Sequence, residues 1–542
     1  MEACKEAERV QQCKRRKMEA CREEEEDHIS LLPDHILCSI LSRLPISHAA
    51  QTSVLSKRWA HVWKSAPSIA FRRDLESYSS ALTHRSKLQR LARDVARHAR
   101  CVFAAHTGPV SACELVHSQF NPMSDIERWI QQLSRRRIQH LALICRREAF
   151  DRYSAWPFEH EEEQRGGEQG VLENARPFAG CVDLTTLRLD SVHLSDQVLA
   201  DIIRCCVALE QLVLCDCLGL SEITIRSATL KGLELKKLAG LTGSVDVKAT
   251  SLYTFSVCDL SSAVVNCNLI SDILGNSPHL ERMSLQNCDL GSLRIRASNL
   301  KFLDLRMLRI EGDVDIDAPR LASLRMSDVH CTGLFDIATP NLQSLSSRYG
   351  AGADQGLQLK DYAYQSNADL YARIAHLFGK SPPEAAERIV STPFYSLNKL
   401  SINLDLNNQR AAIVLAYLLK SCPHLQELMV LIENGTEGQS NEIFASHNFY
   451  SDKRHNESPY WEGQDVYSYI THQLKTVELR GFTGRLLELD FARFVIRRAV
   501  ALQTMTVECV KGLSKEGEQA TRLLKSLPRA SLTAYIIIKP RF

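Results

Sequence analysis

Apolar residues between positions 27 and 71 recur with the period of an α-helix. One helical face carries Ile36, Leu37, Ile40, Leu41 and Leu44. Pro33 suits the first turn of this helix, where a backbone N–H has no partner, and Pro45 ends it. Ser47 and Ser56 are placed to cap a second and a third helix. The pattern therefore predicts three short helices.

This segment holds more large apolar side chains than its length can bury. Roughly forty residues do not close a core around so many Leu, Ile and Trp side chains. We expect part of the apolar surface to pack against a partner protein. The residues expected on that surface are Leu32, Pro33, Ile36, Leu37, Ile40, Leu41, Val54 and Trp59.

The chain from 72 to 180 has a mixed pattern, which predicts a connector with first, irregular repeats. Strands are expected around Leu91–Cys101 and Val110–Phe120. Ile126, Trp129, Ile130 and Leu133 share one face of an amphipathic helix over Asp125–Leu133, with Ser124 as its possible cap. Alternation over Ile138–Leu143 predicts another strand, and the polar stretch 159–176 predicts an exposed loop.

From about residue 183 the chain repeats the pattern L-x-x-L-x-L, with most steps about 20–22 residues long. The units begin at Leu209, Leu230, Leu252, Leu280, Leu300, Leu321 and Leu342. One unit cannot bury the apolar face of its strand, so the units are expected to stack into a leucine-rich-repeat solenoid. Longer units should add helices at Asp196–Cys206 and Leu269–Leu274, whereas the short units near 230, 300 and 321 should lack them.

Two cysteines, Cys217 and Cys288, occupy the position that this repeat gives to Asn or Cys. We expect them to satisfy the turn from inside. The pattern breaks over 346–392, where helices are expected at Asp369–Phe378 and Pro383–Val390, and it resumes at Leu397. Because the phrase at 276–285 recurs at 421–430, we expect one continuous array on both sides of the break.

The predicted fold class is α/β, with a small three-helix segment followed by an irregular solenoid. The expected organisation along the chain is as follows: a charged tail at 1–26, helices at 27–71, the connector at 72–180, repeats at 181–345, an interruption at 346–396, and further repeats with a terminal cap at 397–542.

Composition narrows the class of protein. Hydrophobic residues make up 44% and charged residues 24%, as in ordinary globular chains, and the net charge of +2 favours neither nucleic acid nor a membrane as partner. The charged start and the lack of a long apolar run argue against a secretory signal and a membrane span, so we expect the cytosol, the nucleus or both. A basic run over Lys14–Lys17 could serve nuclear import or could be a solvated surface.

The sequence lacks the motifs expected of an enzyme. It has no phosphate-binding loop, nucleophile elbow or dinucleotide-binding fingerprint, and no pair of cysteines has the C-x-x-C spacing of a zinc site. We therefore expect neither catalysis nor a cofactor or metal, and we interpret most of the eighteen cysteines as small buried side chains.

Residues 27–71 closely resemble an F-box, in the form found in plant F-box/leucine-rich-repeat proteins. The resemblance rests on L-P-D at 32–34, L-P at 44–45 and S-K-R-W at 56–59, together with the apolar spacing between them. Residues 459–507, with Trp461, Gly481 and Phe482, are similar to the FBD segment that ends many of these proteins.

The resemblance implies docking on a Skp-type adaptor and, through it, on a cullin–RING ubiquitin ligase. The residues implied in adaptor binding are Leu32, Pro33, Ile36, Leu37, Ile40, Leu41, Leu44, Pro45, Val54 and Trp59. An unknown target protein is expected on outward strand positions of the repeats: Gln211, Val213, Arg282, Ser284, Lys301 and Asp304. Two alternatives stay open, namely a scaffold whose F-box does not support ubiquitination and a receptor gated by a small molecule.

Overall fold

The structure is a computed structural model, and it describes only part of the chain. The described residues are 29, 31–71, 85–118, 123–146, 171–172, 174–238, 241, 243–260, 267–331, 335–348, 394–404, 406–407, 412, 415–416, 418–419, 422–432, 461 and 472–540. Two compact units, Met1–Arg188 and Leu189–Phe542, are described separately. The expected helices between 346 and 392, the charged tail and the basic run at 14–17 lie outside the described residues.

Unit 1 begins with a helical segment, residues 31–71. Its elements are α2 (Asp34–Leu41), α3 (Ile46–Gln51), the 3-10 turn η1 (Thr52–Val54), α4 (Trp59–Val62) and the 3-10 turn η2 (Trp63–Ser65). Pro33 and Pro45 are the residues that directly precede α2 and α3. Ser47 lies inside α3, so its predicted capping role is wrong. Ser56 does accept a hydrogen bond from the Trp59 backbone N–H, at 3.4 Å.

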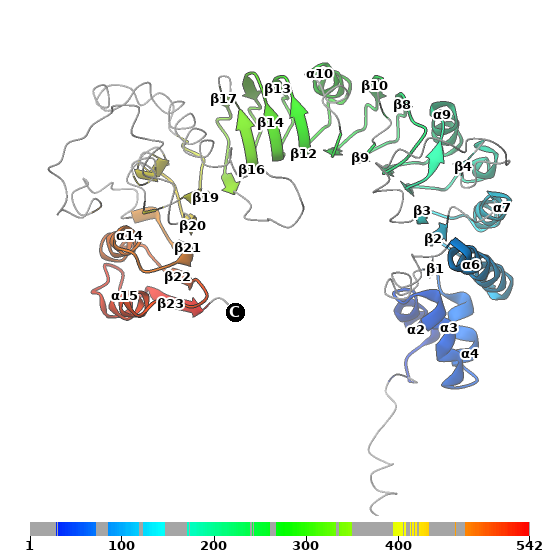
Figure 1. Cartoon of the computed structure of the whole chain (residues 1–542), viewed down its shortest axis with the longest axis horizontal. Helices are drawn as coiled ribbons and strands as arrows, with labels where there is room; N and C mark the ends of the chain where they lie inside the picture. Colours follow the sequence, from blue (N-terminus) through cyan, green and yellow to red (C-terminus); the bar gives the residue numbers. More distant parts are fainter. Residues whose placement is uncertain are drawn as a thin grey trace, which may run out of the picture. The chain divides into compact units, whose positions relative to one another are not determined.

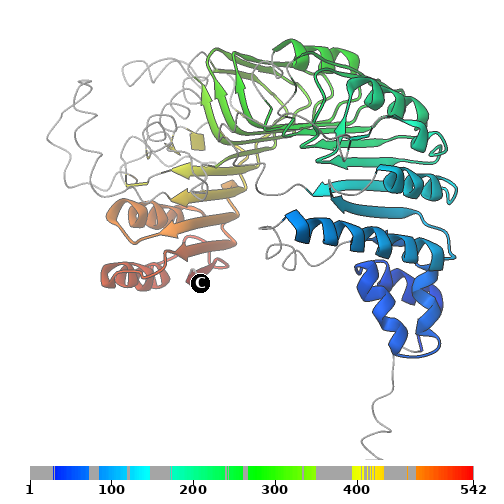
Figure 2. The ribbon, with the colours of Figure 1, turned by 45° about the vertical axis from the view of Figure 1, so that its right-hand side comes forward.

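The rest of unit 1 alternates strands and helices. Its elements are β1 (Ser68–Ala70), α6 (Arg85–Ala105), β2 (Ala112–Ser118), α7 (Met123–Ser134), β3 (His140–Arg146), β4 (Val171–Leu172) and the 3-10 turn η3 (Arg176–Phe178). Strands β1, β2 and β3 pair in parallel in that order. Figure 2 shows the long helix α6 beside the helical segment.

Two sequence predictions fail in this region. The strand expected around Leu91–Cys101 is wrong, because those residues lie within α6. The buried side chains Ala96, Ala99, Val102 and Phe103 recur every three or four residues, which is helical spacing. Ser124 does not cap α7, since this helix already begins at Met123. The strand over Val110–Phe120 and the helix over Asp125–Leu133 are confirmed as β2 and α7.

Unit 2 is a ladder of parallel strands (Figure 1). After β5 (Thr186–Asp190), which spans the division, the ladder runs through β7 (Gln211–Cys215), β9 (Gly232–Lys236), β11 (Thr254–Cys258), β12 (Arg282–Leu290), β14 (Phe302–Ile310), β16 (Ser323–Cys331), β18 (Ser344–Arg348), β19 (Lys399–Leu404), β20 (Glu427–Ile432), β21 (Thr476–Phe482), β22 (Thr504–Cys509) and β23 (Tyr535–Pro540).

A second layer of unit 2 lies behind the ladder. It holds β6 (His193–Leu194), α9 (Asp196–Cys205), β8 (Ile223–Arg226), β10 (Val245–Lys248), α10 (Cys267–Asn276), β13 (Leu293–Arg296), β15 (Val314–Asp317), β17 (Phe335–Ala338), α14 (Leu486–Arg498) and α15 (Lys515–Ser526). Helices α9 and α10 confirm the two predicted helices. The short repeats near 230, 300 and 321 carry the strands β10, β15 and β17 in this layer, because about twenty residues leave no room for a helix.

The leucines of the repeat point into the core between these layers. Leu209, Leu212 and Leu214 are buried, as are their counterparts Leu280, Met283 and Leu285. The predicted continuity across 346–392 is confirmed for the sheet, because Ser344, Leu345 and Ser346 of β18 pair with Lys399, Leu400 and Ser401 of β19. The fold class is therefore the predicted one, a helical segment followed by a leucine-rich-repeat solenoid.

Left-handed backbone bends directly precede Cys217, which follows β7, and Cys288, which lies within β12. The preceding residue in each case, Asp216 or Asn287, has a left-handed backbone with φ of 51° or 50°. The Cys217 thiol contacts the carbonyl oxygen of Leu189 at 3.5 Å, and the Cys288 thiol contacts that of Gln286 at 3.2 Å. Burial raises the pKa of Cys217 to about 12 and also raises the pKa of Cys288. The Cys217 thiol therefore holds the turn after β7, as the sequence predicts, whereas the Cys288 thiol lies beside a left-handed bend within β12.

The C-terminal repeats form a strand, a glycine turn, a helix and a strand, namely β21, the turn at Gly481, α14 and β22. Gly481 has a φ of 82° at the end of β21, and Phe482 is fully buried. Glu488, in the first turn of α14, is buried and accepts hydrogen bonds from the backbone N–H groups of Thr483 and Gly484 at 2.7 and 3.0 Å. The buried Trp461 ring packs against Phe491 and Phe494 of α14.

Candidate functional site

The helical segment exposes a set of large apolar side chains. Val54 is 87% exposed and Leu31 is 73% exposed, although apolar side chains of this size are usually buried. Ile36, Ile40 and Leu44 follow at intervals of four residues along and beyond α2, so they line up on its outer side. Ile29 and Leu55 complete the exposed apolar set, which consists of Ile29, Leu31, Ile36, Ile40, Leu44, Val54 and Leu55.

The predicted surface is partly wrong. Leu37, Leu41 and Trp59 are buried inside the helical segment, at 0%, 2% and 6% exposure, so they are core residues here. A helical period shows which residues share a face, but the packing of α2 against α4 decides which side of that face turns inward. Of the other predicted residues, Leu32 and Pro45 are half-buried and Pro33 is exposed.

An ion pair joins the two ends of this surface. The Arg58 guanidinium donates to Asp34 Oδ1 from Nε at 2.8 Å, and it also donates to the backbone carbonyl of Leu32. Asp34 begins α2, whereas Arg58 directly precedes α4. The contact holds the stretch that carries Val54 and Leu55 beside the start of α2. The L-P-D and S-K-R-W motifs therefore meet in space although they are far apart in sequence.

The helical segment is joined to the strands and helices that follow it by a buried histidine. His106, at the end of α6, lies 2.9 Å through Nε2 from the carbonyl oxygen of Ala66. Its Nδ1 lies 3.1 Å from Nη1 of Arg136, which follows α7. The Arg136 Nη2 group donates to the carbonyl oxygens of Phe103 and His106 at 3.1 and 3.0 Å. Burial lowers the pKa of His106, so the ring is neutral, donating from Nε2 and accepting at Nδ1.

Backbone contacts strengthen this joint, which consists of Lys64–Phe71, His106, Gly108 and Arg136. The N–H groups of Thr107 and Gly108 both donate to the Lys64 carbonyl at 3.0 Å. A Cβ atom on Gly108 would lie 2.7 Å from Cα of Ser65, so only glycine fits there. Strand β1 then pairs with β2. The helical segment is thus built into unit 1, which its sequence pattern did not indicate.

The six candidate residues for target binding fall in or beside two rows of the unit 2 ladder. Gln211, Gly232, Thr254, Arg282 and Phe302 are register partners in the first row. The second row holds Val213, Glu234, Ser256, Ser284, Asp304 and Arg325. Lys301 directly precedes β14. All six are exposed or half-buried, in agreement with the predicted outward orientation; target binding itself stays a prediction.

Three of these six side chains, those of Arg282, Lys301 and Asp304, already contact other side chains of the same chain. Asp304 pairs with Arg306 at 2.6 Å and with Arg325 at 3.4 Å, and its hydrogen bond raises the pKa of Arg306. Lys301 pairs with Glu281 at 2.7 Å. The Arg282 guanidinium carbon lies 4.3 Å from the centre of the Phe302 ring. The sequence pattern missed Glu234, Phe302 and Arg325, because only strand register shows that they share these rows.

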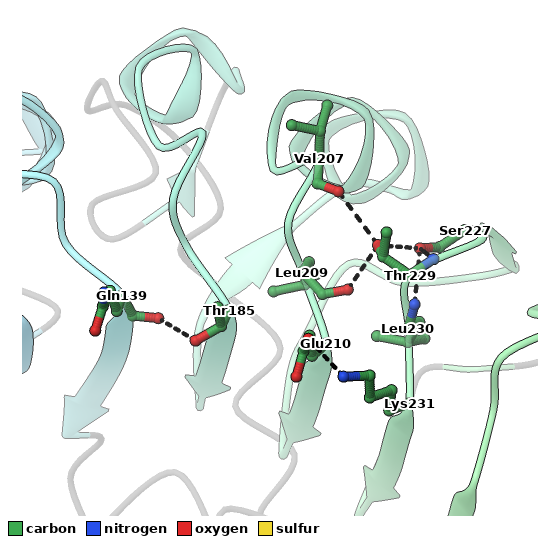
Figure 3. Close-up of polar contacts among 9 residues, drawn as sticks. All are labelled: Gln139, Thr185, Val207, Leu209, Glu210, Ser227, Thr229, Leu230 and Lys231. Carbon is green, nitrogen blue, oxygen red and sulfur yellow. Dashed lines mark hydrogen bonds and ion pairs between the residues drawn. The ribbon is translucent and has the colours of Figure 1, made fainter.

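Polar contacts between neighbouring repeats lie at the starts of several strands (Figure 3). In unit 1 the Thr185 hydroxyl donates to the Gln139 carbonyl at 3.0 Å. In unit 2 the Thr229 hydroxyl donates to the Leu209 carbonyl at 2.9 Å, and Lys231 pairs with Glu210 at 2.6 Å. Glu281 and Lys301 repeat the Glu210–Lys231 contact three repeats further along, so the outward rows form a fixed surface with alternating charge.

Two negative findings apply to the described part of the chain. No helix there is both long and apolar enough to cross a membrane. Nor do three or more His, Cys, Asp or Glu side chains gather there in a way that could hold a metal ion.

Comparison with known families matches most of this architecture. The F-box domain model matches residues 29–70. The model for the leucine-rich repeats of FBD-associated F-box protein At5g56370 matches 126–253. The model for the At1g61320/AtMIF1 leucine-rich-repeat domain matches 258–533, which is just over half of the chain.

Individual relatives from Arabidopsis thaliana agree with this assignment. F-box/FBD/LRR-repeat protein At5g53840 is 23% identical over 525 residues, 95% of this chain and 96% of that protein. FBD-associated F-box protein At5g22730 is 21% identical over 95% of this chain and 94% of that protein. F-box protein At1g80960 is 27% identical over 270 residues, and there the match spans 47% of this chain and about half, 53%, of that relative.

The exposed apolar set lies within the F-box match, and the aligned repeat strands lie within the leucine-rich-repeat matches. Two relatives that match over 95% of the chain carry FBD in their names. The chain belongs to the matched leucine-rich-repeat family and is a plant-type F-box/leucine-rich-repeat protein with an FBD-like C-terminal segment.

Proposed function

We propose that this protein is the substrate-recruiting subunit of a Skp–cullin–F-box ubiquitin ligase. One observation carries the proposal: the segment matched by the F-box model exposes seven large apolar side chains on a folded helical scaffold. F-box domains generally bind Skp-type adaptors, and leucine-rich repeats bind proteins. The F-box therefore holds the ligase, and the repeats hold the target.

The size of the exposed apolar set supports this assignment. Fully burying one side chain of the size of Leu or Ile contributes about 1.5–3 kcal/mol. Association costs roughly 4–15 kcal/mol in lost freedom of motion. The seven side chains are between 36% and 87% exposed, so their exposed surface equals that of about four fully exposed side chains, or roughly 6–12 kcal/mol. That is of the same size as the cost of association, which one or two side chains would not meet. The Asp34–Arg58 ion pair holds the two halves of the surface together before binding, so less ordering is needed.

The target side of the proposal uses the two outward rows of unit 2. Alternating charges such as Asp304 beside Arg306 and Arg325, and Glu478 beside Arg480, favour a polar protein surface with complementary charges. Transfer of ubiquitin belongs to the conjugating enzyme of the ligase, and this chain contributes by holding the target near it. We place the complex in the cytosol, the nucleus or both.

The adaptor contact is tested by co-purification of the full-length chain with a Skp-type adaptor. The double variant Ile36→Asp with Ile40→Asp places two carboxylates on the exposed side of α2 and should abolish adaptor capture. A matched control, Leu486→Asp with Leu532→Asp, makes the same chemical change at exposed positions of unit 2 and should leave capture unchanged.

Thermal unfolding of both variants checks that the protein still folds. Full capture by a folded Ile36→Asp/Ile40→Asp variant would refute the assignment of the adaptor surface. Loss of capture in the control variant as well would show that the contact lies elsewhere in the chain.

A further inference from the structure

The strand β23 is the outer strand of the unit 2 ladder. Among the described residues, β22 is the one strand that pairs with it. Its sequence, Tyr-Ile-Ile-Ile-Lys-Pro, is apolar over four positions, and Tyr535 and Ile537 are exposed. Long, apolar outer strands of this kind act as templates for pairing with another strand.

Hydrogen-bond direction shows which backbone groups of β23 are left facing outward. The Tyr535 N–H donates to the Gln503 carbonyl, on the β22 side, at 2.9 Å. The N–H and C=O of one strand residue point to the same side, and successive residues alternate. Tyr535, Ile537 and Lys539 therefore face β22, whereas Ile536 and Ile538 turn their backbone groups to the open side.

The two ends of the open edge are closed to pairing. The Ala534 N–H donates to the Ser531 carbonyl at 3.3 Å, and the Ala534 carbonyl accepts from Arg529 Nη1 at 2.6 Å. Pro540 has no N–H to donate. The usable edge is thus limited to Ile536 and Ile538, on either side of Ile537.

This edge is complementary to itself. If a second β23 runs antiparallel with Ile537 opposite Ile537, then Ile536 and Ile538 of one copy exchange both backbone bonds with Ile538 and Ile536 of the other. If the pairing were centred on Ile536, Ile538 would lie opposite Ala534, whose N–H and C=O are already bonded within the chain. If it were centred on Ile538, Ile536 would lie opposite Pro540, which has no N–H. Both shifts lose bonds, so a single register satisfies every open group.

The side chains agree with that register. On the outer face, Ile537 meets its own copy, and Tyr535 lies opposite Lys539 of the second copy, where the ammonium can contact the ring. The two lysines are not opposite each other, so no like charges meet. On the inner face, Ile536 and Ile538 are half-buried, whereas Met505 and Val507 of β22 are fully buried. A second copy would cover that remaining apolar area.

We infer that β23 joins two copies of this protein in an antiparallel, two-fold pairing centred on Ile537. The proposal concerns a surface apart from the F-box and is independent of the proposed ligase role. Symmetric pairs of identical chains are the commonest oligomers of soluble proteins, which fits an edge that is complementary to itself.

Sedimentation of the full-length chain tests the pairing. The purified protein should have twice the 61.0 kDa mass of one chain. Ile537→Lys and Ile537→Glu, each alone, place like charges opposite each other at the two-fold axis and should halve the mass. An equal mixture of the two variants places Lys opposite Glu and should restore the double mass.

Two controls separate pairing from misfolding. Val500→Lys makes the same change at an apolar position of similar exposure, 50% against 41%, and should leave the dimer intact. Restoration by the charge pair can occur only if both single variants fold. Three results would overturn the inference. The wild-type protein could have the mass of a single chain at high concentration, Ile537→Lys could leave the dimer intact, or the mixture of the two variants could stay monomeric.

Discussion

The half-buried guanidinium of Arg136 holds His106 in place at the joint between the F-box and α6, beside the backbone contacts described above. The Arg136→Ala substitution removes three hydrogen bonds, one to His106 Nδ1 and two to the carbonyls of Phe103 and His106. Hydrogen bonds from a charged donor contribute about 1.5–3 kcal/mol each in favourable cases. Because Arg136 is partly exposed, solvent weakens these hydrogen bonds, and we expect a local destabilisation of about 2–4 kcal/mol in total.

Hydrogen exchange measured by mass spectrometry on the full-length chain is the suitable assay, because a chain with two units need not unfold in one step. The loss of these hydrogen bonds in Arg136→Ala should speed exchange of the backbone amides of residues 64–71 and 106–112 by about 30- to 700-fold. Peptides of unit 2 should exchange as in the wild type. The next residue, Arg137, provides the control, since its side chain is exposed and pairs on the surface with Asp183. Arg137→Ala should leave exchange at the joint unchanged.

Three outcomes would refute this reasoning. Unchanged exchange at 64–71 in Arg136→Ala would mean that strand pairing alone holds the F-box in place. Equal effects of the two arginine substitutions would show that the half-buried position of Arg136 does not matter. Faster exchange throughout unit 2 would show that the effect is global rather than confined to the joint.

Further predictions address titration, cysteine reactivity and the terminal cap. Because burial holds the pKa of His106 below its usual 6.5, the joint should be fully stable above about pH 6.5 and weaken as the pH falls below that value, which exchange corrected for its intrinsic pH dependence will show. Alkylation of the native protein at pH 7.5 should modify the exposed Cys101 but spare Cys217, whose pKa is about 12; modification of Cys217 at a similar rate would contradict its burial. Glu488→Ala leaves the N–H groups of Thr483 and Gly484 without their acceptor and should destabilise the cap by about 2–4 kcal/mol, seen as a lower melting temperature; an unchanged melting temperature would contradict a structural role for this buried carboxylate.

The sequence alone determined the class of fold and the position of its repeats. A period of about 20–22 residues with leucine at fixed places leaves one arrangement that buries every unit, namely stacked parallel strands. The continuity of the sheet across the interruption, seen in the pairing of β18 with β19, was predicted from the similarity of segments 276–285 and 421–430. Repeats of similar sequence offer similar stacking surfaces. The turn cysteine Cys217 was predicted for the same reason.

Other features depend on contacts between residues that are distant in sequence. Periodicity grouped Ile36, Leu37, Ile40 and Leu41 on one face, but packing of α2 on α4 buried Leu37 and Leu41 and left the isoleucines exposed. The segment Leu91–Cys101 is different, because it is rich in Ala and Arg, which favour the helix α6 over the predicted strand without any distant contact. Only tertiary structure places His106 between the Ala66 carbonyl and the Arg136 guanidinium, since these groups belong to residues forty and thirty positions away from it. Likewise, only the pairing of β23 with β22 shows that the open edge is limited to Ile536 and Ile538. The sequence alone does not show which backbone N–H and C=O groups point away from the sheet.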